Sequence, residues 1–200
     1  KNNTKTNCIE HFIRNMINVG TSDNKININD MFFLWKIYLK NKNIPNTILK
    51  TEFENIMKNK FHNNNNYFIG LKSSYLKKVK LFKKFWQNKV IKDDNDEIEI
   101  SELYALLIKW LEYDDNIINF TEENLQDMIE YFYDDIDIKD DKFLSGIKCN
   151  LWDKLGDMKE AFDNKFNKKF DKNLKIYDAY VMYCKYANNN GKLLTVSKSY

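Results

Sequence analysis

The chain has 200 residues, of which 43% are hydrophobic and 30% are charged, a balance that supports a packed core and argues against disorder throughout. Five glycines and one proline exclude collagen-like and proline-rich chains, and no window approaches the roughly eighteen apolar residues of a membrane span. Three widely spaced cysteines without a CxxC pair favour a reducing environment over a disulfide framework.

The net charge of +3 hides a strong segregation of charge along the chain. Residues 1–92 carry +13, residues 93–141 carry −16 and residues 142–200 carry +6. Arg14 is the one arginine, so nearly all of the positive charge comes from lysine. Because lysine lacks the planar fork that reads guanine, a partner held by these lysines is bound with little sequence readout. We also expect the chain, which begins at Lys1, to be a piece of a longer polypeptide.

Apolar residues recur at helical spacing three times in the first part of the chain. The three predicted helices cover residues 8–19, 31–42 and about 47–60. Asn29 or Asp30 provides an N-cap for the second, and Pro45 supports a break before the third, because the residue before a proline is disfavoured in helical geometry. The segment Tyr67–Leu71 then predicts a short strand. This order is the plan of a winged helix-turn-helix, with a plain helical bundle as the alternative.

A fourth helix is predicted from Ser73 onward, and its polar side carries lysines without a single acid. These lysines are Lys72, Lys77, Lys78, Lys80, Lys83, Lys84, Lys89 and Lys92. Uncompensated like charges repel one another, a cost that an ordinary surface avoids by mixing the two signs. We interpret the helix as a surface for phosphate-backbone contact; the alternatives are the solvent-exposed side of an ordinary helix and a helix that lies on a membrane surface.

The polar segment Asp93–Glu97 is predicted to separate a basic winged-helix-like domain, residues 1–92, from a helical domain, residues 93–200, whose first half is acidic. Two helices of the second domain are predicted to begin at Ser101 and at Thr121, the latter as an N-cap. Further elements are an apolar patch at 142–155, helices at 158–170 and 176–186, and the start of a strand at 193–196. The predicted fold class is therefore mainly α, with a winged helix-turn-helix-like N-terminal part and a helical C-terminal part.

Motifs for catalysis, nucleotide binding and metal binding are missing from the sequence. The acidic stretches 93–102 and 134–141 lack the register of a calcium-binding loop. We expect no catalytic residue, no metal and no cofactor. The predicted site binds nucleic acid instead, and its residues are Lys50, Asn55, Lys58, Lys60, Lys72, Lys77, Lys78, Lys80, Lys83 and Lys84. The alternative is a protein-interaction module in which the basic and acidic parts engage partners or each other, with no nucleic-acid role.

Several runs of the sequence resemble the region after the helicase core in the poxvirus-type primase-helicases of nucleocytoplasmic large DNA viruses. The first run is INDMFFLWKIYLKNKNIPNTILKTEFENIMKNKF, followed by NYFIGLKSSYL and LFKKFWQNKV. The later runs KCNLWDKLGDMKEAF and IYDAYVMYCKYANNNGKLLTVSKSY are similar to the C-terminal extension of the giant-virus members. The resemblance covers most of the chain through aromatic and structural positions.

The resemblance implies a winged-helix-like element behind a superfamily 3 helicase, and so a non-catalytic accessory domain of a DNA-replication protein. It implies backbone binding of single-stranded or forked DNA, largely without sequence specificity, and association with the parent hexamer, with no membrane partner. It places the protein in the viral factory of the host cytoplasm, or otherwise inside a cell. The family's Walker motifs, arginine finger and primase metal carboxylates have no counterpart in this sequence, and none is carried over.

Overall fold

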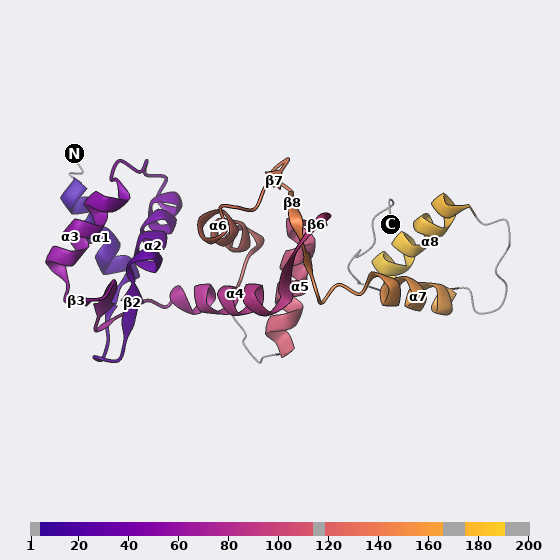
Figure 1. Cartoon of the computed structure of the whole chain (residues 1–200), viewed down its shortest axis with the longest axis horizontal. Helices are drawn as coiled ribbons and strands as arrows, with labels where there is room; N and C mark the ends of the chain where they lie inside the picture. Colours follow the sequence, from indigo (N-terminus) through magenta and orange to yellow (C-terminus); the bar gives the residue numbers. More distant parts are fainter. Residues whose placement is uncertain (1–4, 114–118, 166–174, 191–200) are drawn as a thin grey trace. The chain divides into compact units, whose positions relative to one another are not determined.

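The structure is a computed structural model that describes residues 5–113, 119–165 and 175–190. The chain divides into two compact units, which we call the N-terminal unit (Lys1–Leu81) and the C-terminal unit (Phe82–Tyr200). The division falls inside helix α4 (Leu76–Lys89), which is labelled in Figure 1. The segment Asp93–Glu97, predicted as a linker between domains, instead forms part of strand β6 (Val90–Glu99).

The N-terminal unit combines three helices with two small antiparallel sheets and the first part of α4. Its other elements are α1 (Lys5–Met16), β1 (Asn18–Val19), β2 (Lys25–Asn27), α2 (Ile28–Asn41), α3 (Lys50–Lys60), β3 (Asn63–Asn64), β4 (Tyr67–Ile69) and β5 (Leu71–Lys72). One sheet has the order β2-β4-β3 and the other pairs β1 with β5. The three predicted helices are present, although α1 ends and α3 begins about one turn inside the predicted limits.

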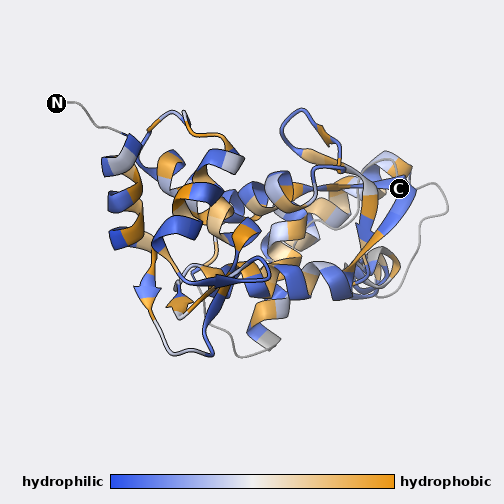
Figure 2. Ribbon diagram, turned by 60° about the vertical axis from the view of Figure 1, so that its left-hand side comes forward, coloured by the Kyte–Doolittle hydropathy of each residue, from blue (hydrophilic) through white to orange (hydrophobic). Residues whose placement is uncertain are grey.

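The core of the N-terminal unit is built around α2, in which eight of the fourteen residues are buried. The ring of Trp35 lies 5.4 Å from the rings of both Phe12 in α1 and Phe53 in α3, measured between ring centres. Helices α1 and α3 turn an apolar side inward and a polar side outward, whereas α2 is buried at every position from Met31 to Leu39 except Lys36. Figure 2 shows hydrophilic and hydrophobic residues on different sides of helices in this chain. Stacked and edge-on rings of this kind fix the three helices against one another.

The C-terminal unit contains a third antiparallel sheet, with the strand order β6-β8-β7. Its elements after α4 are β6, α5 (Ile100–Tyr113), α6 (Glu122–Phe132), β7 (Ile138–Lys139), β8 (Phe143–Cys149), α7 (Lys154–Lys165) and α8 (Ile176–Asn189). The predicted N-cap of α6 is confirmed, because Thr121 Oγ1 accepts a hydrogen bond from the Asn124 amide at 3.2 Å. Helices α7 and α8 pack on each other through Ala161, Tyr183 and Tyr186.

The predicted mainly α fold class is wrong: the described residues form three antiparallel sheets as well as the helices, and the chain is an α/β mixture. The C-terminal part is not simply helical, since the apolar patch predicted at 142–155 contains the central strand β8. In the N-terminal unit, strand β2 pairs with β4. This strand was not predicted, because three residues are too few to show the alternation of apolar and polar side chains that identifies a strand in a sequence. The strand start predicted at 193–196, and residues 166–170 of the helix predicted at 158–170, lie outside the described residues.

The hairpin between β3 and β4 turns through Asn65 and Asn66, whose φ angles are +44° and +64°. Two positive φ angles in a two-residue turn are typical of the type I′ hairpin, and asparagine tolerates them. We predict that Asn66→Val destabilises the N-terminal unit by about 1–2 kcal/mol, whereas Asn66→Gly does not. Urea-induced unfolding, followed through the amide signals of this unit, measures the change.

The matched control is Asn64→Val, at an exposed strand position of the same hairpin. A β-branched residue is compatible with extended backbone there, so stability should be retained. Equal losses at positions 64 and 66 would contradict the turn assignment.

Candidate nucleic-acid interface

Helix α4 carries three exposed lysines, Lys77, Lys80 and Lys84, which we call the lysine stripe. Their spacing of three and four residues places them on one side of the helix, over about 10 Å of its axis. The opposite side is apolar and buried through Leu76, Val79, Phe82, Phe85 and Trp86. The stripe depends on the geometry of this one helix, because burial of the apolar side turns the lysines outward.

Two lysines of the stripe, Lys77 and Lys80, have no ion pair or hydrogen bond through their ammonium groups to any residue that the structure describes. The third, Lys84, places its Nζ atom 5.4 Å from the centre of the Trp110 ring in α5. A cation above an indole ring is weakly attracted to it and stays exposed to solvent. The stripe therefore presents positive charge to solvent.

The other predicted lysines near the stripe have different surroundings. Lys78 is half-buried with its Nζ 5.4 Å from the centre of the Tyr75 ring, and burial lowers its pKa. Lys83 is also half-buried, with its Nζ 4.1 Å from the centre of the Phe132 ring. Lys72 is exposed on strand β5. Lys78 and Lys83 thus flank the stripe, and both contact aromatic rings.

The predicted site residues on α3 form a weaker candidate surface. Lys50 Nζ donates a hydrogen bond to Asn29 Oδ1 at 2.9 Å, Lys58 Nζ lies 3.9 Å from Glu54, and Lys60 Nζ lies 3.6 Å from Glu10. Asn55 is exposed on the same helix. Exposed pairs like these are weak and exchange with other partners. Each nevertheless places a carboxylate or an amide beside a lysine that was predicted to bind phosphate, so these lysines are less available to phosphate than Lys77 and Lys80.

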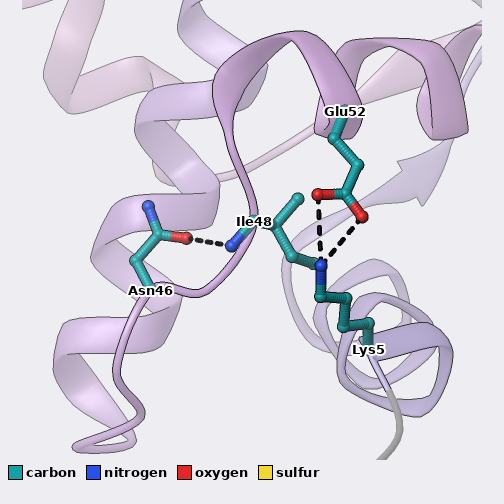
Figure 3. A network of polar contacts seen from close by, with 4 residues as sticks. All are labelled: Lys5, Asn46, Ile48 and Glu52. Carbon is teal, nitrogen blue, oxygen red and sulfur yellow. Dashed lines mark hydrogen bonds and ion pairs between the residues drawn. The ribbon is translucent and has the colours of Figure 1, made fainter.

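Helix α3 is fixed to α1 and to the preceding turn by polar contacts. Lys5 Nζ lies 3.0 and 3.2 Å from the two carboxylate oxygens of Glu52, and the Ile48 amide donates to Asn46 Oδ1 at 3.2 Å (Figure 3). The Asn46 contact closes the turn after Pro45, where the sequence predicted a break. The acidic Glu52 and Glu54 on this helix offset part of its lysine charge.

Some acidic side chains of the segment 93–141 form ion pairs within the C-terminal unit. No pattern in the sequence indicated these pairs. Lys92 pairs with Asp135 at 2.8 Å, Lys142 pairs with Glu99 at 2.8 Å, and Lys148 pairs with Asp93. Five of these six residues lie in or beside the sheet, where β6 pairs with β8. The partners in the Lys148 pair are 55 residues apart, so local spacing could not reveal them.

The acidic residues at the start of the segment 93–141 interrupt the regular pairing of strand β6. The pairing of β6 with β8 shifts between Lys92 and Glu97, so Asp93–Asp96 have no register partners, and Gly146 of β8 has a φ of +77°. Asp93 also accepts a hydrogen bond from the Asn95 amide. Within the described ranges, no group of three or more His, Cys, Asp or Glu residues is placed to hold a metal ion.

No helix among residues 5–113, 119–165 and 175–190 is both long enough and apolar enough to cross a membrane. Comparisons with protein-family models, with curated proteins and with solved structures found no match. The function is therefore inferred from the charges and contacts of this chain.

The Lys148 ammonium and the Asn95 amide lower the pKa of the Asp93 carboxyl, and Lys92 lowers that of Asp135. Because the folded-state pKa is the lower one, each pair stabilises the fold above the unfolded-state value of about 3.9, and this contribution is lost as the pH falls through the folded pKa. We predict that Lys148→Gln raises the Asp93 pKa towards its ordinary value. Carboxyl ¹³C NMR during an acid titration measures the shift.

In the same variant Asp135 serves as an internal control, because its partner Lys92 is unchanged. The reciprocal variant Lys92→Gln should raise the pKa of Asp135 and leave that of Asp93 where it is. If both carboxyls shift together in either variant, the effect comes from the overall charge and the pairwise assignment fails.

Proposed function

We propose that this chain is a non-catalytic accessory domain that binds the phosphate backbone of DNA largely without sequence specificity. The observation that carries the proposal is the lysine stripe of α4, two of whose ammonium groups, those of Lys77 and Lys80, have no partner among the described residues. A lysine that neutralises a phosphate releases condensed counterions, which favours binding at low salt. On the same helix, Lys78 and Lys83 flank the stripe in the helical spacing and add positive charge beside it.

The chemistry of the cations supports backbone binding over base readout. Lysine is a compact point charge that suits a phosphate oxygen, whereas specific contacts to guanine are typically made by the arginine fork. The single arginine, Arg14, lies on α1 and not on α4. Asn55 on α3 is the one predicted site residue that offers the amide pattern suited to adenine.

The distribution of charge along the chain favours the N-terminal unit as the part that meets a polyanion. Residues 1–81 carry a net charge of +9, whereas residues 82–200 carry −6. The described ion pairs of the acidic segment involve Lys92, Lys142 and Lys148 and leave Lys77 and Lys80 uncompensated. A polyanion is attracted to the basic residues and repelled by the acidic ones.

The proposal extends to the parent protein on the strength of the resemblance in sequence alone. The chain would be the region behind the helicase core of a viral primase-helicase that acts in DNA replication, on single-stranded or forked DNA. Association with the parent hexamer and location in the viral factory of the host cytoplasm belong to the same proposal. Sequencing the complete reading frame tests this part, because a superfamily 3 helicase core should precede Lys1.

The backbone-binding part is tested by fluorescence anisotropy of labelled DNA at several salt concentrations. We predict that replacing Lys77, Lys80 and Lys84 together by glutamine lowers the slope of log affinity against log salt by about 2 to 3, since each phosphate contact contributes about 0.7 in a single strand and about 0.9 in a duplex. Scrambling the DNA sequence should leave the affinity of the unchanged protein nearly constant.

The matched control replaces three exposed lysines of α2 and its C-cap, Lys36, Lys40 and Lys42, by glutamine. It removes the same net charge, so a slope that falls equally in both triple variants would reflect overall charge and overturn the stripe as the site. A third triple variant, at Lys50, Lys58 and Lys60, measures the share of α3. Binding that is absent at low salt, or indifferent to salt, would refute the proposed function.

A further inference from the structure

The N-terminal unit has a second candidate site, and it contains the single arginine of the chain. Glu10, Ile13 and Arg14 share one side of α1, at spacings of three and four residues, and lie beside Lys60 and Phe61 at the end of α3. These five side chains line an open hollow of about 360 Å³. Because the hollow is open to solvent, a side chain of a partner can reach these residues.

The charges in the hollow leave one cation without a partner. Lys60 Nζ lies 3.6 Å from Glu10, so these two opposite charges offset each other. Arg14 is exposed, and no ion pair or hydrogen bond links its guanidinium group to any described residue. A guanidinium group offers five N–H donors in a planar fork that matches the two oxygens of a carboxylate.

The rest of the lining is apolar and held in place. Ile13 and Phe61 are both half-buried, so part of each side chain faces the hollow. The Phe61 ring packs edge-on against the buried Phe68, with the ring centres 6.4 Å apart. Covering Ile13 and Phe61 with an apolar group would remove their exposed surface from water, which is favourable. The hollow therefore suits a ligand that has both an anionic head and an apolar body.

The apolar lining, and not the charge of the nearby helix ends, favours a carboxylate on an apolar body over a free phosphate. Arg14 lies in the last turn of α1, and Lys60 is the last residue of α3, so the carbonyl ends of both helices are close to the hollow. Each such end carries a partial negative charge equivalent to about half an elementary charge. These partial charges repel a dianion twice as strongly as a monoanion, but Arg14 attracts the two in the same ratio, so charge alone does not choose between them. A free phosphate has no apolar part to cover Ile13 and Phe61, whereas a carboxylate on an apolar body does.

We propose that this hollow binds a peptide segment in which an acidic residue stands next to an aromatic or aliphatic one. The carboxylate pairs with the Arg14 guanidinium, and the apolar side chain lies over Ile13 and Phe61. This partner is a polypeptide, so the site is independent of the lysine stripe and of the DNA proposed to bind there.

The single arginine makes the test direct, because the ¹⁵N-labelled chain has one arginine Nε–H signal. The probe is the capped dipeptide acetyl-Phe-Glu-amide, titrated into the full chain. The Arg14 Nε–H signal and the Ile13 methyl signals are expected to shift together and to saturate. The neutral analogue acetyl-Phe-Gln-amide should bind roughly tenfold more weakly, because it cannot form the charged hydrogen bonds. Inorganic phosphate should not saturate the Ile13 methyl signals.

Two variants distinguish the paired hydrogen bonds of the Arg14 guanidinium group from the effect of its positive charge alone. Arg14→Lys keeps the positive charge and should lower the affinity for the acidic dipeptide by roughly tenfold, as measured on the Ile13 methyl signals. Lys42→Gln, at an exposed residue that does not line the hollow, should leave the affinity unchanged. Equal binding of the two dipeptides, saturation of Ile13 by phosphate, or an unaltered affinity in Arg14→Lys would each overturn the proposal.

Discussion

The need to bury one side of α4 determines where the charge of this protein lies. Phe82 and Phe85 are completely buried, and the Trp86 ring stacks on Tyr133 with 4.3 Å between the ring centres. Burying side chains of this size contributes about 1.5–3 kcal/mol each, far more than the repulsion between exposed lysines costs. The apolar side therefore sets the rotation of the helix, and Lys77, Lys80 and Lys84 are turned towards solvent as a consequence.

The helices of this chain could be predicted from the sequence because each carries a long apolar stripe or a clear cap. Thr121 is an example, since a hydroxyl before two glutamates is a local signal and the structure confirms it. The sheets could not be predicted in the same way. Strands β1 and β2 have two and three residues, and Asp93–Asp96 of β6 are as polar as a linker. Strand pairing is made by backbone groups, so a polar run can belong to a strand whose partner is distant in the sequence.

For the candidate sites too, the sequence predicts local spacing but not contacts between distant segments. A spacing of four residues on an amphipathic helix is enough to identify Lys80 and Lys84 as neighbours from the sequence alone. The local sequence does not reveal that Lys83 contacts an aromatic ring, because Phe132 lies on another helix. The hollow at Arg14 was not predicted for the same reason, since part of its lining comes from α1 and part from the end of α3.

The exposed charge of Lys77 and Lys80 does not come from a shortage of acids. The segment 93–141 carries eighteen acidic side chains, yet Asp93, Glu99 and Asp135 pair with lysines of their own unit. Two lysines about 6 Å apart in water repel each other by only about 0.7 kcal/mol, so folding tolerates the neighbouring cations Lys77 and Lys80 at small cost. A polyanion bound at this surface, as proposed, would relieve that repulsion with its phosphates. Three of the acids, Asp93, Glu99 and Asp135, are instead paired with other lysines in and beside the β6–β8 sheet, so they are not partners of Lys77 or Lys80.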